Sequence, residues 1–222
     1  MTFKYIRFPD PNEYDDEGLV AIGGDLSSDM IISAYIQGLF PWYSENDPIL
    51  WWSPNPRMIL YPDKMKVSKS LNQSLRNKNI SVRFDYNFNA VINNCAKVKR
   101  KNQEGTWILP EIIEAYGHLH QLGIAHSVEV YYNNNLCGGL YGLAIGKVFF
   151  GESMFHYRTD ASKIALFHLC QKLILMQYDF IDVQQSTSHL KSIGAQDLPR
   201  IIFLKKLRES VIFPSENLNW HL

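Results

Sequence analysis

The feature that most constrains the fold is a change of apolar spacing in the second half of the chain. Residues 126–150 form short strand-like runs separated by Asn133-Asn-Asn135 and Gly146-Lys147, which tolerate positive φ and close antiparallel hairpins. A long, largely apolar helical segment follows over 160–176, and a second strand-like run covers 180–184. Strands, a buried helix and a further strand predict an α+β fold with the helix packed on the sheet.

Helix signals also occur in the first half of the chain. A segment that begins at Ser27 or Ser28, residues favoured at a helix N-cap, and ends at Gly38 predicts a short helix. The spacing of Leu71, Leu75 and Ile80 after Pro62 predicts a second helix. Pro110 suits the first turn of a third helix, over 111–122, which ends at a glycine.

Three of the five tryptophans, Trp42, Trp51 and Trp52, are clustered in a proline-rich stretch. The prolines at positions 41, 48, 54 and 56 exclude a long helix or a central strand there. Rings on such an irregular backbone form either a small aromatic core or a wall for a flat ligand such as a nucleobase. The residues alone leave both interpretations open.

The formal net charge is zero, but the charges are segregated along the chain. Residues 1–55 hold nine acids and two bases, a net of −7, whereas residues 56–110 hold eleven bases and three acids, a net of +8. The basic section predicts either a footprint for a polyanion or a solvated surface that faces the acidic first segment.

Several classes of protein are disfavoured. The three cysteines, Cys95, Cys137 and Cys170, lack CxxC spacing, which argues against a disulfide framework and a zinc ribbon. The histidines lack ligand spacing, so we expect no metal. Because the chain also has no apolar signal core and no uncharged run long enough to span a bilayer, we expect a cytoplasmic protein without membrane association.

Three polar residues are candidates for chemistry. Asp182 and Gln184 are two apart on a predicted strand, so both side chains should leave the same face of the sheet. Such a pair either orients a nucleophile or forms hydrogen bonds with the backbone of a neighbouring loop. Glu152 follows the apolar run 148–150, where a carboxylate has either a buried partner or a cationic ligand. Without a nucleophile motif, an enzyme of this kind would act by positioning its substrates.

Taken in order, ten motifs resemble the leucyl/phenylalanyl-tRNA-protein transferase family. They cover residues 18–27, 38–42, 47–57, 105–108, 125–129, 138–142, 150–155, 160–163, 181–184 and 192–195. The resemblance implies an enzyme that moves leucine, phenylalanine or methionine from aminoacyl-tRNA to proteins that begin with arginine or lysine, in the bacterial N-degron pathway. It also implies a small N-terminal domain, expected over 1–57, joined to a domain like the Gcn5-related acetyltransferases (GNAT-like) over 58–222.

The resemblance also implies roles for particular residues. Asp182 and Gln184 would lie at the reaction centre, Glu152 would face the basic residue of the acceptor, and Trp42 and Trp107 would contact the terminal adenosine of the tRNA. The pocket for the transferred side chain would be lined by Leu140, Leu166, Leu169, Leu173 and Ile181. We expect the basic section, and Lys99, Arg100 and Lys101 in particular, to contact tRNA phosphates. No cofactor is expected, and nothing demands more than a monomer.

Two other functions compete with this one. An N-acyltransferase that uses acyl-coenzyme A would suit the second half of the chain, but the glycine-containing loop that holds a pyrophosphate before a helix is absent from the sequence. A noncatalytic RNA-binding module would use the tryptophans as a stacking platform. In that case Asp182, Gln184 and Glu152 would be dispensable.

Overall fold

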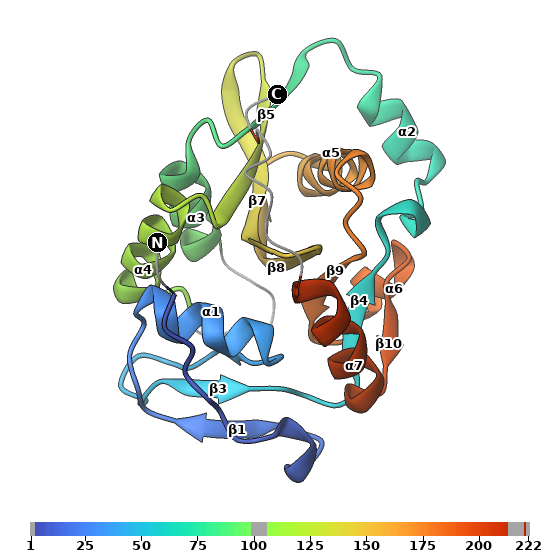
Figure 1. Ribbon diagram of the computed structural model, residues 1–222. Coiled ribbons are helices and arrows are strands. Elements are labelled where there is room, and N and C mark those ends of the chain that lie inside the picture. Colours follow the sequence, from blue (N-terminus) through green and yellow to red (C-terminus); the bar gives the residue numbers. More distant parts are fainter. Residues whose placement is uncertain (1–2, 99–105, 213–219, 221–222) are drawn as a thin grey trace.

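The computed structural model describes residues 3–98, 106–212 and 220 (Figure 1). A short 3-10 turn, η1 (Pro11–Glu13), precedes a small antiparallel sheet with the strand order β1-β3-β2. The sheet consists of β1 (Leu19–Ile22), β2 (Phe40–Pro41) and β3 (Leu50–Trp52), and helix α1 (Ser28–Ile36) connects its first two strands.

The larger sheet has seven strands in the order β10-β4-β9-β8-β7-β6-β5. All neighbours are antiparallel except β8 and β9, so the sheet is mixed and the predicted α+β class is confirmed. The strands are β4 (Arg57–Leu60), β5 (Ile80–Phe84), β6 (Ala125–Tyr132), β7 (Asn135–Ile145), β8 (Val148–His156), β9 (Phe180–Gln184) and β10 (Gln196–Leu198).

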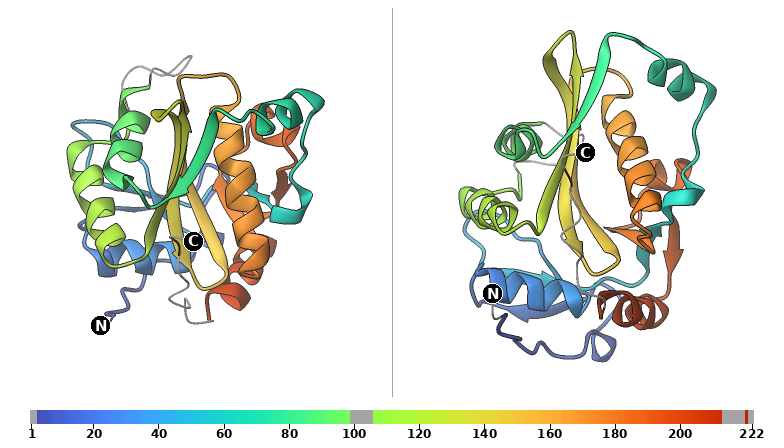
Figure 2. Two further views of the ribbon diagram at one scale, coloured as in Figure 1. Left: turned by 90° about the horizontal axis from the view of Figure 1, so that it is seen from above. Right: turned by 45° about the horizontal axis from the view of Figure 1, so that its top comes forward.

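Helices cover both faces of the larger sheet (Figure 2). The long helix α5 (Ala161–Leu175) packs on β6 and β7 from one side, and α3 (Phe88–Lys97) packs on the same strands from the other side, next to α4 (Pro110–Gln121). α5 links β8 to β9, the crossover that a parallel pair requires. The remaining short elements are η2 (Pro62–Lys64), α2 (Lys69–Leu75) and α6 (Ser188–Ser192).

The last helix, α7 (Arg200–Val211), packs against α1 and against β8 of the larger sheet. Gly38, at the end of α1, comes so close to Leu204 that a Cβ built on the glycine would lie 2.3 Å from that side chain. Gly38 also has a φ of +86°, a conformation that favours glycine over residues with a Cβ. The domain boundary expected at residue 57 stays a prediction.

Most of the predicted elements occur where the sequence placed them. The hydroxyl of Ser27 accepts the backbone N–H of Met30 and caps α1, and α4 begins at Pro110. The helix expected to extend to Ile80 ends at Leu75 instead, and residues 80–84 form an edge strand paired with β6. Tertiary pairing with β6 therefore overrode the local helical spacing.

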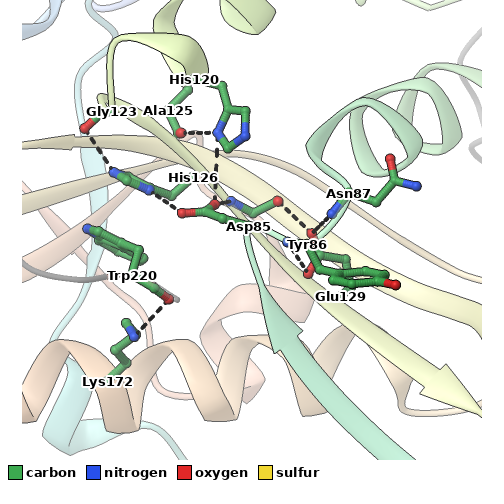
Figure 3. Close-up of polar contacts among 11 residues, drawn as sticks. Asp85, Tyr86, Asn87, His120, Gly123, Ala125, His126, Glu129, Lys172 and Trp220 are labelled. Carbon is green, nitrogen blue, oxygen red and sulfur yellow. Dashed lines mark hydrogen bonds and ion pairs between the residues drawn. The ribbon is translucent and has the colours of Figure 1, made fainter. Parts of the chain in front are cut away.

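A buried polar cluster closes the end of β5 (Figure 3). Nδ1 of His126 lies 2.7 Å from Oδ2 of Asp85, and the carboxylate of Glu129 accepts the backbone N–H groups of Tyr86 and Asn87 just before α3. The ring of Trp220 stacks on His126 with the centroids 4.0 Å apart. This contact fastens a residue near the carboxyl end of the chain to the core.

We expect Trp220→Ala to reduce the free energy of unfolding by about 3 kcal/mol, the usual cost of truncating a buried aromatic side chain. Trp220 is 5% exposed, and its carbonyl also accepts a hydrogen bond from Nζ of Lys172. Urea denaturation would measure the loss. The control, Trp220→Phe, keeps a ring for stacking and should lose less than half as much; equal stability of all three proteins would contradict this packing.

Candidate active site

Two adjoining cavities open beside the small sheet, where the pairing of β8 with β9 ends. The larger has a volume of about 430 Å³ and is lined by Phe40, Pro41, Trp42, Trp107, Glu152, Ser153, Met154, Val183, Gln184, Gln185, Thr187, His189 and Leu190. The smaller, of about 120 Å³, is mainly apolar and is lined by Leu140, Tyr141, Phe149, Gly151, Glu152, Ser153, Met154, Leu166, Leu169, Ile181, Val183 and Leu190. The residues that line both cavities, and so lie at their junction, are Glu152, Ser153, Met154, Val183 and Leu190.

Two β-bulges shape this junction. In β8, Tyr141 pairs with Ser153 and Gly142 with Gly151, so Glu152 is the extra residue. In β9, Met58 pairs with Gln184 and Ile59 with Asp182, so Val183 is extra. A bulge interrupts the alternation of a strand and redirects its side chains.

The two parallel strands stop pairing just before these bulges. Their register runs from Val148 opposite Phe180 to Phe150 opposite Asp182 and ends there. Glu152 and Gln184 follow on the two strands, and their side chains are hydrogen-bonded across the gap. The end of the ladder thus creates the space into which both side chains point.

Glu152 is surrounded by hydrogen-bond donors. Its Oε1 accepts from the hydroxyl of Tyr35, at 2.8 Å, and from Nε2 of Gln184, at 2.9 Å, while its Oε2 accepts from the hydroxyl of Tyr116, at 3.2 Å. The two phenol oxygens lie 2.6 Å apart. Tyr35 comes from α1 and Tyr116 from α4, so helices on different parts of the chain orient one carboxyl group.

Burial raises the pKa of Glu152 from 4.5 to about 8. The loss of hydration dominates; the hydrogen bonds from the tyrosines and the charge of Arg57 lower the pKa, and the charge of Asp182 raises it further.

Asp182 differs from Glu152 in its surroundings. It is fully buried, and both of its oxygens accept hydrogen bonds from the guanidinium of Arg57, at 2.9 and 2.7 Å. Its Oδ1 also accepts the backbone N–H of Gln184 at 2.9 Å. The expectation that Asp182 and Gln184 leave one face together is wrong, because the bulge at Val183 breaks the alternation: Gln184 lines the larger cavity and Asp182 lines neither.

The tryptophan cluster divides between the two interpretations. Trp51 is buried, packs edge-on against Phe8 and donates its indole N–H to the carbonyl of Gly23, so it belongs to the core. Trp42 is 39% exposed and lines the larger cavity together with Trp107. Trp52 supports Trp42 by donating its N–H to the Trp42 carbonyl at 2.6 Å.

The pocket residues expected from the resemblance lie close together with one exception. Leu140, Leu166, Leu169 and Ile181 line the smaller cavity. Leu173 is fully buried one turn beyond Leu169 and does not line this cavity. The three basic residues expected at tRNA phosphates, Lys99, Arg100 and Lys101, lie outside the described residues.

Sequence reasoning missed three side chains at this site, namely Arg57, Tyr35 and Tyr116. Each had only a weak signal. Arg57 stood at the end of the Trp-Trp-Ser-Pro-Asn-Pro-Arg motif, and each tyrosine followed a helical spacing that is equally typical of core packing. Their common function, to surround two carboxylates, depends on contacts between residues 36 to 125 positions apart in the sequence.

Comparisons with known proteins identify the family. The model described as "Leucyl/phenylalanyl-tRNA protein transferase" matches residues 59–208, and the model of that family's N-terminal domain matches residues 24–55. The leucyl/phenylalanyl-tRNA–protein transferase of Desulfatibacillum aliphaticivorans is 49% identical over 217 residues, which are 98% of this chain and 93% of the relative. The chain belongs to this transferase family.

The comparisons also found further relatives and some solved structures. The transferases of Maridesulfovibrio salexigens and Sulfurimonas denitrificans are 50% and 52% identical, and the matches cover 96% and 92% of this chain and 89% of each relative. A GCN5-related N-acetyltransferase from Kribbella flavida superimposes with a TM-score of 0.41 and 9% identity, covering 78% of this chain and 61% of that chain. An aminoglycoside acetyltransferase from an uncultured soil metagenomic sample superimposes with a TM-score of 0.37 and 12% identity, and the match covers 60% of this chain and 89% of that chain.

The family membership confirms the predicted resemblance and the prediction of an aminoacyltransferase. Within the described ranges, no group of three or more His, Cys, Asp or Glu side chains is arranged to hold a metal ion. In the same part of the chain, no helix has the length and apolar character that crossing a membrane requires.

Glu152→Gln should make stability less dependent on pH. A folded-state pKa of about 8, above the ordinary 4.5, means that the folded protein binds this proton more tightly than the unfolded chain. The stabilisation is complete below pH 4.5 and is lost as the pH rises through 8. Glutamine does not titrate. The free energy of unfolding of the variant, measured by urea denaturation, should therefore rise relative to that of the wild type between about pH 5 and about pH 8.5. Parallel stability curves would contradict the shifted pKa.

Proposed function

We propose that the chain transfers leucine, phenylalanine or methionine from aminoacyl-tRNA to the α-amino group of proteins that begin with arginine or lysine, in the N-degron pathway. The observation that carries the proposal is the junction at Glu152, to which Gln184 is hydrogen-bonded, with a small apolar cavity on one side and a larger cavity with two tryptophans on the other. We also propose that the chain acts as a monomer without a cofactor.

The donor would bind across both cavities. Trp42 and Trp107 offer ring faces for the terminal adenine of the tRNA, since stacking on aromatic rings tolerates a nucleobase well. The transferred side chain would enter the cavity of about 120 Å³, whose walls include Leu140, Leu169 and Ile181. Apolar walls favour an aliphatic or aromatic side chain over a polar one, because a polar group would lose its hydration there.

The acceptor would be recognised by charge. Glu152 is the only acidic residue among the described residues that line the larger cavity. Its raised pKa shows that the ionised form is unfavourable in the free protein. A guanidinium or ammonium group nearby would stabilise the ionised form, so binding of a cationic side chain and loss of the Glu152 proton would favour each other.

The reaction itself needs alignment more than activation. The α-amino nitrogen attacks the ester carbonyl carbon, the new peptide bond forms, and the ester C–O bond breaks so that the ribose oxygen leaves as a hydroxyl. Holding the two reactants at about 3 Å supplies several kcal/mol of the barrier. The proton lost by the amine reaches the ribose oxygen directly or through water.

Gln184 is suited to hold the amine rather than to take its proton. Its Nε2 donates to Glu152, which leaves its Oε1 to accept a hydrogen bond from the attacking α-amino group. An amide carbonyl is barely basic, so this contact orients the amine and does not deprotonate it. Asp182 supports the same arrangement because its carboxylate accepts the backbone N–H of Gln184.

Radiolabelled phenylalanyl-tRNA and two peptides would test this function. A peptide that begins with arginine should become labelled, whereas a peptide identical except for an initial alanine should not. Labelled acetyl-coenzyme A, offered to the same peptides, tests the competing acyltransferase. Label from coenzyme A, or tRNA binding without transfer to either peptide, would overturn the proposal.

Leu169→Trp should reduce transfer of phenylalanine more than about 100-fold, because the indole would fill the smaller cavity and exclude the substrate ring. Leu169→Met, which conserves volume, is the control and should stay within a few-fold of the wild type. Single-turnover kinetics with phenylalanyl-tRNA would measure both variants. Unchanged transfer by the tryptophan variant, with its folding verified by circular dichroism, would remove Leu169 from the pocket.

A further inference from the structure

Arg57 is a fully enclosed charged side chain next to the candidate active site. It begins β4 and is 0% exposed, as is its partner Asp182. The guanidinium carbon lies 4.8 Å from the ring centroid of Phe40 and 4.7 Å from that of Phe203, so two aromatic rings hold the planar group in place. Nε and Nη2 form a two-point contact with the carboxylate.

Such a pair is a poor source of stability. Two charges lose their hydration on burial, and an apolar pair of similar volume often serves a fold as well or better. Arg57 bears a further cost, because its Nη1 is buried without a hydrogen-bond partner among the described residues. A role beyond stability is therefore the better explanation of this pair.

The pair acts on Gln184 through the backbone. Gln184 has a φ of +64°, in the left-handed region that side chains other than glycine rarely adopt. The third hydrogen bond to Asp182 comes from the backbone N–H of Gln184, two residues further on, which is the contact of an Asx turn. Because the two-point contact with Arg57 fixes the carboxylate plane, it also fixes the direction in which this carboxylate accepts the N–H.

We propose that Arg57 is a positioning residue for the transfer reaction: through Asp182 it holds the left-handed turn at Gln184 and so directs the Gln184 amide into the cavity. The inference rests on the proposed function of Gln184. It explains why Asp182, although close to the reaction centre in sequence, lines neither cavity. This role of Arg57 also requires a planar group that donates two parallel hydrogen bonds, which lysine cannot provide.

Arg57→Lys tests the proposal because it keeps the charge and removes the fork. The expected result is a fall in kcat of at least about 10-fold, with the KM for phenylalanyl-tRNA within about twofold of the wild type, since Arg57 lines neither cavity. If the role of Arg57 were purely structural, the Arg57→Lys variant would have a lower Tm, and its kcat at temperatures well below that Tm would equal that of the wild type. Steady-state transfer assays at 15 °C and thermal unfolding would give both quantities.

Arg200→Lys is a matched control. Arg200 is also buried, at 5% exposure, but its guanidinium donates to the backbone carbonyls of Tyr14, Asp15 and Ser53 and has no link to Gln184. This variant should lose stability and keep its kcat within about twofold. A matching loss of kcat in both lysine variants would overturn the proposal.

A second variant covers the case in which Arg57→Lys does not fold. Phe203→Leu removes one of the two rings over the guanidinium and keeps the ion pair, so the fork is held less firmly. We expect a 3- to 5-fold fall in kcat, again without a change in KM. Wild-type kcat in every folded variant at position 57 or 203 would overturn the role of Arg57. Failure of the wild type to label the arginine peptide would overturn the proposed function instead.

Discussion

The candidate active site depends on the early end of one parallel strand pair. β8 and β9 are hydrogen-bonded only from Val148 and Phe180 to Phe150 and Asp182, and each strand bulges directly afterwards. If the two strands had continued to pair, the backbone N–H and C=O groups after Phe150 and Asp182 would have bonded to each other and left no gap between the strands. Here the backbone separates, and the side chains that follow bridge the gap.

The two carboxylates at this gap have opposite environments. Asp182 has a permanent cation beside it and three directed donors, so its charge is already compensated inside the protein. Glu152 has only neutral donors within hydrogen-bond distance, and the charge of Arg57 acts on it only from further away. Asp182 thus holds the turn at Gln184, whereas Glu152 is available to a cation from outside. This division follows from the partner of each carboxylate rather than from its distance to the cavity.

The sequence predicted what depends on local spacing. The hairpins from β6 to β8, the cap of α1 by Ser27 and the buried helix α5 follow from turn residues and apolar periodicity. Period-two reasoning failed at β9, because a bulge arises from the pairing of two strands and leaves no pattern within one of them. The edge strand β5 was missed for a similar reason, since its apolar residues suit a helix equally well until β6 is present.

The position of Glu152 also explains why residues from distant parts of the chain form one site. Tyr35 comes from α1, in the part matched by the family's N-terminal domain, whereas Tyr116 and Glu152 come from the part matched by the main family model. A fragment without α1 would leave Oε1 of Glu152 with Gln184 as its remaining donor and would open the buried carboxyl group to water. Hydration favours the ionised form, so the pKa would fall toward its ordinary value. The first part of the chain therefore sets the charge of the group to which we assign recognition of the acceptor, as well as contributing a tryptophan to the cavity wall.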